Sequence, residues 1–136
     1  MGEDYLERRI ESCKGQGLMG IATVDNCSSS WSKRLDHLEI RRVCTDGTPN
    51  LSSYLIGRAT QACFALGARV VVTYTRPWES CSSPLAAGFL LDRAEFTPDM
   101  QKGIFRWVKR RDGERASERR VTKEVMAKVR LHQDAA

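Results

Sequence analysis

The sequence has no run of apolar residues long enough to cross a membrane, and residues 1–14 lack the basic and then apolar layout of a signal peptide. Its five cysteines are dispersed, with no Cys-x-x-Cys pair. The odd number and the spacing argue against a disulfide framework and against a zinc site. We therefore expect a cytoplasmic protein with no metal site and no membrane partner.

Aromatic residues make up only 7% of the chain, and neither repeats nor low-complexity segments occur. A length of 136 residues with 41% hydrophobic and 29% charged residues is typical of one globular domain. The charge is uneven, because residues 102–130 hold 11 Lys and Arg against 4 Asp and Glu, a surplus of 7, while the whole chain carries +5. Such a segment is typical either of a face that binds polyanions or of a solvated charged surface.

The order of the apolar patterns predicts alternating helices and strands. Two-residue alternation and apolar runs indicate strands, and three- or four-residue spacing indicates helices. The predicted strands cover residues 18–24, 37–44, 70–75, 89–96 and 103–110. The predicted helices cover residues 2–13, 51–66, 82–87 and 121–132, and a polar turn containing Trp31 covers residues 25–33. Gly67 is the expected glycine stop of the helix over residues 51–66.

Residues 45–53, TDGTPNLSS, mark the point where an extended run ends and an amphipathic helix begins. Pro49 suits the first helical position, which makes Thr48 the expected N-cap and Asn50 the alternative. A strand, a helix and a second strand within about thirty residues predict a βαβ unit with parallel strands. The helix would begin at the carboxyl end of the first strand, where its free amides and dipole attract anions.

Hydroxyl groups surround this helix start, from Thr45, Thr48, Ser52 and Ser53. One interpretation is a cradle for phosphate or pyrophosphate; the other is that these residues only cap the helix and face water. In the strand just upstream, the two-residue alternation slips near Arg41 and Arg42. The slip predicts a β-bulge, a feature that often lies beside active sites.

Several motifs occur together between Arg41 and Phe89: Cys44-Thr-Asp-Gly-Thr48, Val72-Thr-Tyr-Thr75 and Ala86-Ala-Gly-Phe89. With these motifs, residues 18–108 resemble the GNAT (Gcn5-related acyltransferase) superfamily, most closely a small branch from phages and bacterial mobile elements. That branch is distantly similar to Mom-type proteins, which modify adenine in DNA. The resemblance implies an α/β (α+β) fold: a mixed, mainly antiparallel sheet with a central parallel βαβ unit and flanking helices. It implies one domain over residues 1–136, with its core at about 18–108.

The resemblance also implies a function, the transfer of an acyl group from acetyl-CoA or another acyl-CoA to an amine, with a DNA base as the favoured acceptor. The implied cofactor-binding residues are Val43, Cys44, Thr45, Thr48, Asn50, Ser52 and Ser53. Two departures from the family pattern stand out. The pyrophosphate loop has no glycine, and Pro84 occupies the position of the usual tyrosine acid. The short N-terminal part leaves two alternatives, a reduced fold or a homodimer whose second copy completes the acceptor wall.

Four residues are the catalytic candidates: Glu79, Tyr74, Ser83 and Asp46. Glu79 would be the general base, Tyr74 would place its hydroxyl in the cleft, and Ser83 is the hydroxyl nearest the missing tyrosine. For Tyr74 the alternative is a packed aromatic, and for Asp46 it is a turn-forming role before glycine. Cys44 is either an acyl-carrying nucleophile or a buried inert thiol.

The basic segment supplies the candidates for contact with nucleic acid. Trp107 would stack on a base or, alternatively, cover the sheet, while arginines would contact phosphates. The nucleic-acid candidates are Trp107, Arg110, Arg111, Arg115, Arg119 and Arg120. Two functions from different classes therefore remain open, an acyltransferase and a non-catalytic nucleic-acid-binding or regulatory protein on a degenerate GNAT scaffold.

Overall fold

A computed structural model describes residues 17–27 and 36–135 of the chain. The predicted helix over residues 2–13 and the turn at Trp31 lie outside this range. The strands are β1 (Gly20–Asn26), β2 (His37–Thr45), β3 (Val70–Thr75), β4 (Leu90–Phe96) and β5 (Gly103–Arg110). The helices are α2 (Leu51–Ala65), α3 (Ser82–Ala86) and α4 (Ala116–Ala135).

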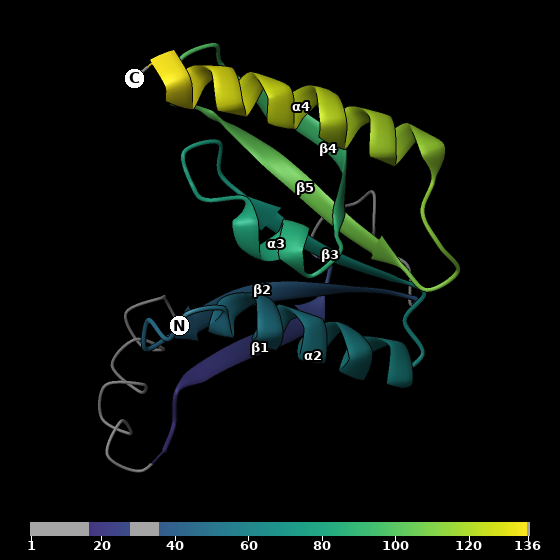
Figure 1. Cartoon of the computed structure of the whole chain (residues 1–136). Helices are drawn as coiled ribbons and strands as arrows, with labels where there is room; N and C mark the ends of the chain where they lie inside the picture. Colours follow the sequence, from purple (N-terminus) through teal and green to yellow (C-terminus); the bar gives the residue numbers. More distant parts are fainter. Residues whose placement is uncertain (1–16, 28–35, 136) are drawn as a thin grey trace.

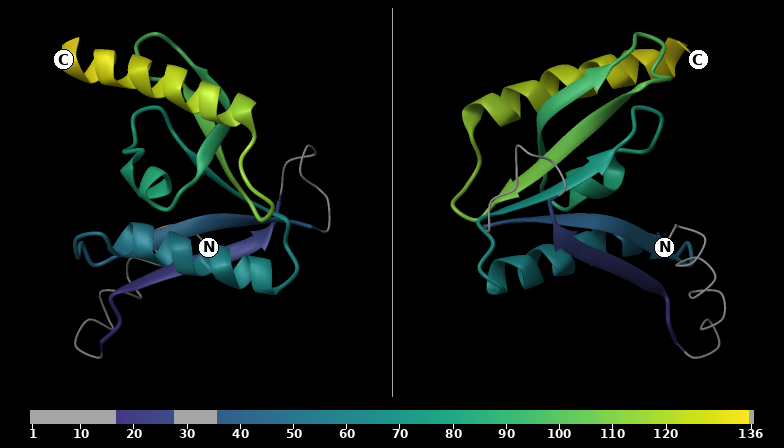
Figure 2. Two further views of the ribbon diagram at one scale, coloured as in Figure 1. Left: turned by 45° about the vertical axis from the view of Figure 1, so that its right-hand side comes forward. Right: turned by 180° about the vertical axis from the view of Figure 1, so that it is seen from behind.

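The five strands form one sheet in the order β1-β2-β3-β5-β4 (Figure 1). Only β2 and β3 are parallel, and α2 connects them, whereas every other neighbouring pair is antiparallel. The predicted mixed, mainly antiparallel sheet with a central parallel βαβ unit is therefore confirmed. Figure 2 shows α2 and α4 on either side of the short α3.

Helix α2 buries one face against the sheet through Ile56, Thr60 and Cys63. Its end has the geometry of a Schellman motif, because Gly67 N–H donates to Phe64 O and Ala68 N–H donates to Cys63 O, both at 3.0 Å. Gly67 has φ +102°, a conformation that glycine adopts without steric cost. The predicted glycine stop of this helix is confirmed.

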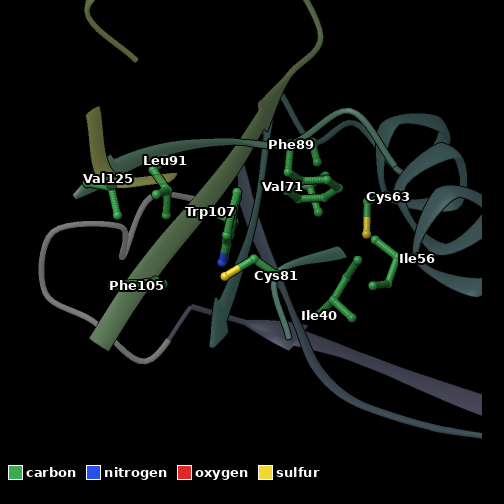
Figure 3. Packing of buried hydrophobic residues seen from close by; sticks show 11 residues of the cluster. Ile40, Ile56, Cys63, Val71, Cys81, Phe89, Leu91, Phe105, Trp107 and Val125 are labelled. Atoms are coloured by element: carbon green, nitrogen blue, oxygen red, sulfur yellow. The ribbon is translucent and has the colours of Figure 1, made fainter. Parts of the chain in front are cut away.

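The main core lies between the sheet and the helices (Figure 3). It contains the fully buried side chains of Trp107, Phe105 and Leu91, with Val125 reaching in from α4. A smaller apolar cluster, formed by Cys27, Val70, Val72 and Val108, covers the other sheet face. Because both faces of β3 are buried, this strand has a run of apolar residues rather than an alternation.

Helix α4 covers the edge of the sheet along β4. Thr122 accepts a hydrogen bond from Leu91 N–H at 2.7 Å, which satisfies a backbone group of the edge strand. The helix starts at Ala116, five residues before the predicted start, and ends three residues after the predicted end. The prediction was too short because the first turn is polar, and a buried ion pair between Glu118 and Arg110 anchors it instead of apolar spacing.

Candidate active site

The candidate site is the gap between β2 and β3. These strands pair over only three residues each, His37–Glu39 with Val70–Val72. Beyond this short ladder they separate, as Figures 1 and 2 show. The hydroxyl of Thr73 donates to Ile40 O at 3.1 Å just past the fork. A cavity of about 670 Å³ occupies the space between the separated strand ends.

A β-bulge in β2 starts directly beyond the fork. Thr23 of β1 lies opposite Arg42, whereas Val24 lies opposite Ile40, so Arg41 is an extra residue in β2. Bulges bend the strand that carries them and increase its twist, which turns β2 away from β3. The bulge predicted at Arg41 and Arg42 is therefore confirmed.

Beyond Glu39, β2 pairs with β1 on one side, and no strand in the described part of the chain pairs with it on the other. The backbone groups on this open side can bind an extended ligand as an added strand would. Val43, Cys44 and Thr45, three of the predicted cofactor-binding residues, line the cavity here. The carboxyl end of β2, which contains these three residues, thus forms one wall of the cavity.

The start of α2 differs from the prediction. Asn50, the alternative, is the N-cap, and Pro49 lies in the preceding turn. Thr48 is not the cap, because its backbone N–H and its hydroxyl both donate to Asp46 Oδ1, at 2.9 and 2.5 Å. Asn50 makes no side-chain hydrogen bond to the first turn, so the amides of that turn receive no side-chain acceptor from the cap.

Asn50 also has φ 66° and ψ 2°, in the left-handed region that glycine usually occupies. Asparagine is one of the few other residues that adopts this conformation at low cost. The loop therefore makes its turn at Asn50 without the glycines that the family pattern contains. This explains how a loop without those glycines can still expose amides at a helix start.

A second cavity of about 300 Å³ lies at this helix start and adjoins the larger one, with Thr45, Ser52 and Ser83 lining both. Hydroxyl and amide side chains dominate its lining, and no acidic residue is among the described residues that form it. The lining residues are Thr45, Gly47, Thr48, Asn50, Ser52, Ser53, Ser82, Ser83 and Ala86.

Glu39 is the residue that the sequence-based analysis missed. Only 8% of it is exposed, it lines the larger cavity at the fork, and its Oε1 has no hydrogen-bond partner within the described part of the chain. A buried carboxylate oxygen without a partner is costly, and such groups occur mainly where function requires them. A signal was present, because a charged residue in a central strand with neighbours on both sides is unusual.

Glu79, the predicted base, lies in the loop after β3 and also lines the cavity. Its Oε1 accepts a hydrogen bond from Arg76 N–H at 2.8 Å, and its own N–H donates to Arg76 O at 3.0 Å. Its carboxylate thus closes a turn. It also acts on Cys81, whose thiol pKa is raised by burial and, to a smaller extent, by the negative charge of Glu79.

Tyr74 and Ser83 line the larger cavity, in agreement with their predicted position, and Tyr74 is partly exposed there. Asp46 lines neither cavity. Its carboxylate instead holds the turn by accepting both bonds from Thr48. The turn-forming alternative for Asp46 therefore replaces the catalytic one.

The predicted nucleic-acid residues are not brought together as one free surface. Trp107 has 0% exposure and donates its indole N–H to Thr75 Oγ1 at 2.9 Å, so the base-stacking prediction for it is wrong. Arg110 donates to Glu118 Oε1 at 3.1 Å and to Glu118 Oε2 at 2.9 and 2.7 Å, in a buried ion pair. The tryptophan is internal because β5 lies between β3 and β4 rather than at an edge.

The other arginines of this group lie on the surface. Arg119 pairs with Glu114 at 2.8 Å, and Arg111 donates to Phe64 O at 2.7 Å. Arg115 and Arg120 are exposed.

None of the helices within residues 17–27 and 36–135 combines the length and the hydropathy that a membrane span requires. In the same ranges, no three His, Cys, Asp or Glu residues form a group suited to a metal ion.

Comparison of the sequence with family models and with curated proteins gives no match. Comparison with solved structures gives matches to acetyltransferases. A Bacillus subtilis acetyltransferase in complex with CoA matches with a TM-score of 0.57 and 13% identity, over 80% of this chain and 84% of that one. A Salmonella typhimurium protein assigned as an acetyltransferase, solved with acetyl-CoA, matches with a TM-score of 0.57 and 14% identity, over 87% and 78%.

A GNAT-family acetyltransferase from Listeria monocytogenes matches with a TM-score of 0.51 and 15% identity, over 69% of this chain and 58% of that one. The chain therefore has the GNAT fold, as the sequence resemblance implied. At such identities the likeness establishes the fold, and the function must be argued from the site.

Proposed function

We propose that the protein is an acyl-CoA-dependent N-acyltransferase. The observation that carries this proposal is Glu39, a buried carboxylate with an unpartnered oxygen at the fork of a GNAT-type cleft. Two of the structural neighbours, from Bacillus subtilis and Salmonella typhimurium, contain CoA and acetyl-CoA. The cleft between β2 and β3 of this chain is lined by a strand end and a helix start that suit such a donor.

The smaller cavity fits the phosphates of an acyl-CoA. Its lining offers the first-turn amides of α2 and the hydroxyls of Ser52, Ser53 and Ser82, and no carboxylate is among the described residues that line it. The larger cavity adjoins it and has the open backbone edge of β2 along one side. The extended arm of the donor would hydrogen-bond to this edge near Cys44.

An acyl-CoA supplies an activated acyl group as a thioester. In the transfer, the amine nitrogen bonds to the acyl carbon while the C–S bond breaks. Glu39 takes the proton that the amine loses, and Tyr74 gives a proton to the departing thiolate. Tyr74 suits the second role because its hydroxyl can donate a proton and its side chain lines the same cleft.

The test is acetyl-CoA binding measured by calorimetry, together with thiol release in the presence of amines, for the wild type and for Glu39→Gln. Wild-type binding and amine-dependent release, with binding retained but release lost in Glu39→Gln, would support the proposal. The matched control is Glu95→Gln, because Glu95 is exposed and bonded to Arg93 outside the cleft. Absence of acetyl-CoA binding in the wild type would overturn the proposed acyltransferase function.

We further propose that the acceptor of the acyl group is a nucleobase amine in DNA. Support for it comes from the exposed Arg115 and Arg120 and from Trp78, whose side chain beside the cleft loop is 60% exposed. The test is mass spectrometry of nucleosides from cells that express the protein or its Glu39→Gln variant. A modified base that is present only with the wild type would support this acceptor, whereas identical profiles would contradict it.

The second candidate function is non-catalytic binding of nucleic acid. The exposed cations Arg115 and Arg120 favour it, because exposed guanidinium groups can contact phosphates. Salt-sensitive DNA binding that Arg115→Gln and Arg120→Gln weaken, without any acetyl-CoA binding, would support this candidate over the enzyme.

A further inference from the structure

The proposed acyltransferase activity leaves the chemical class of the acceptor open, and the inference in this section rests on that activity. We infer that the acceptor amine belongs to a molecule that also carries an anionic group, a carboxylate or a phosphate, which the guanidinium of Arg76 binds at the mouth of the cleft. The arginines on and next to the strands of this sheet differ in whether a carboxylate pairs with them.

Every arginine on β4 and β5 has a carboxylate partner. Arg93 bonds to Glu95, Arg106 bonds to Asp92 at 2.8 Å, and Arg110 bonds to Glu118 at 2.7 Å. The pairs of Arg106 and Arg110 are largely buried, with 5–15% of each side chain exposed. Two of the three pairs are thus protected from solvent, as expected of guanidinium groups that serve the fold.

Arg76 differs, although it directly follows β3 and lines the cavity. Its guanidinium makes one contact of 3.3 Å, with Gly103 O, and no carboxylate pairs with it among the described residues. The nearest acidic side chain in sequence, Glu79, uses its Oε1 to accept a bond from the Arg76 main-chain N–H. Arg76 therefore keeps most of its donors for a ligand.

The charges around the cavity agree with an anionic ligand. The cavity is lined by three arginines, Arg41, Arg42 and Arg76, and by two glutamates. Glu39 lies at the fork of the strands, and Glu79 closes the turn of the loop after β3. Arg41 adds a second exposed guanidinium, which lies 3.6 Å from the carboxylate of Asp25. Among the described residues that line the cavity itself, positive side chains therefore outnumber negative ones by three to two.

The positions along β3 also set a spacing. Val72 pairs with Glu39, and Arg76 comes four residues later, which corresponds to roughly 13 Å along an extended strand. Both side chains are long enough to shorten this gap. An acceptor with its amine at Glu39 and its anion at Arg76 would therefore have several bonds between the two groups. A planar guanidinium suits both anions because it binds carboxylate or phosphate through two parallel hydrogen bonds.

The experiment compares three amines of equal chain length, namely 6-aminohexanoate, 6-aminohexyl phosphate and 6-amino-1-hexanol, as acceptors in thiol release from acetyl-CoA. We expect at least one anionic amine to exceed the alcohol by about tenfold or more in kcat/KM, which corresponds to one charged hydrogen-bonded contact. Comparison of 6-aminohexanoate with 6-aminohexyl phosphate shows whether the site prefers a carboxylate or a phosphate. In Arg76→Gln we expect the preference to fall to within about twofold, with the affinity for acetyl-CoA unchanged.

Arg58→Gln is the matched control, because Arg58 is exposed on α2, bonds to Gln61, and is not among the described residues that line the cleft. It should retain the preference of the wild type. Equal rates for all three amines, no acylation of any of them by a protein that binds acetyl-CoA, or a preference that persists in Arg76→Gln would each overturn the inference. Failure of the wild type to bind acetyl-CoA would instead overturn the proposed function, and the inference with it.

Discussion

Glu39 and Val72 form the last pair in the parallel ladder between β2 and β3, and the two strands separate directly after them. The separation puts a carboxylate at the closed end of a cleft whose walls are the diverging strands. Glu39 is buried and its Oε1 has no partner among the described residues, so this oxygen is available for the proposed role of proton acceptor.

Glu39→Gln should lower kcat for acyl transfer by about a hundredfold or more, because it removes the proposed general base and keeps the shape of the side chain. The affinity for acetyl-CoA should not change. The free energy of unfolding should stay within about 0.5 kcal/mol of the wild type or rise, since a buried charge is removed. Full activity of Glu39→Gln combined with an inactive Glu79→Gln would return the role of base to Glu79.

Tyr74→Phe should lower kcat by about tenfold to a hundredfold while the acetyl-CoA affinity stays constant, because only the proton-donating hydroxyl is lost. Stopped-flow measurement of thiol release with saturating acceptor would check this. Ser83→Ala serves as the comparison, since the serine hydroxyl lines the same cavity and is a weak acid. Loss of activity in Ser83→Ala and not in Tyr74→Phe would reverse the assignment.

Asn50→Ala should lower the free energy of unfolding by about 1 kcal/mol, because alanine carries a steric penalty in the left-handed conformation observed at this position. Asn50→Gly should change it by only a few tenths of a kcal/mol, since glycine adopts the conformation freely. Urea denaturation of the two variants gives the comparison. Equal destabilisation would mean that the asparagine side chain, and not the backbone angle, stabilises the loop.

Arg110→Ala should cost about 3 kcal/mol of unfolding free energy, because it leaves the carboxylate of Glu118, only 5% exposed, without its partner. Arg119→Ala removes an exposed pair with Glu114 and should cost less than about 1 kcal/mol. Chemical denaturation at constant salt measures both. A small effect at Arg110 would imply that Glu118 finds another donor, and its backbone bond from Arg115 is the candidate.

Cys44 should react with N-ethylmaleimide faster than Cys63 and Cys81. Burial raises the thiol pKa of Cys63 and of Cys81, so at neutral pH less of each is the reactive thiolate. Cys44 lines the open cleft and is only partly buried. Saturating acetyl-CoA should slow labelling of Cys44 by about tenfold or more, as peptide mass spectrometry would show. Unchanged labelling would place the donor away from β2.

The local features of the chain could be predicted from the sequence because each depends on neighbouring residues. The glycine stop at Gly67, the bulge at Arg41 and the βαβ order follow from spacing within a few residues. The burial of Glu39 could not be predicted in this way. It depends on β1 and β3 flanking β2, and so on contacts between distant segments.

The same reason explains the error at Trp107. Cations flank this residue in the sequence, which favoured a contact with nucleic acid, but β5 lies between β3 and β4 and the side chain of Trp107 packs in the main core. The order of β5 in the sheet differs from its order in the chain. The residues Thr45, Ser52 and Ser83, by contrast, were selected from two separate segments and do lie around one pair of adjoining cavities.

The contribution of α4 to the sheet also affects when the protein can fold during synthesis. Thr122 satisfies a backbone group of β4, Val125 fills the core, and Glu118 neutralises a strand arginine. All three come from the last part of the described chain. We therefore expect the cleft strands to remain loosely packed on the ribosome until residues 116–125 have emerged from the exit tunnel, so that substrate binding begins only after this late step.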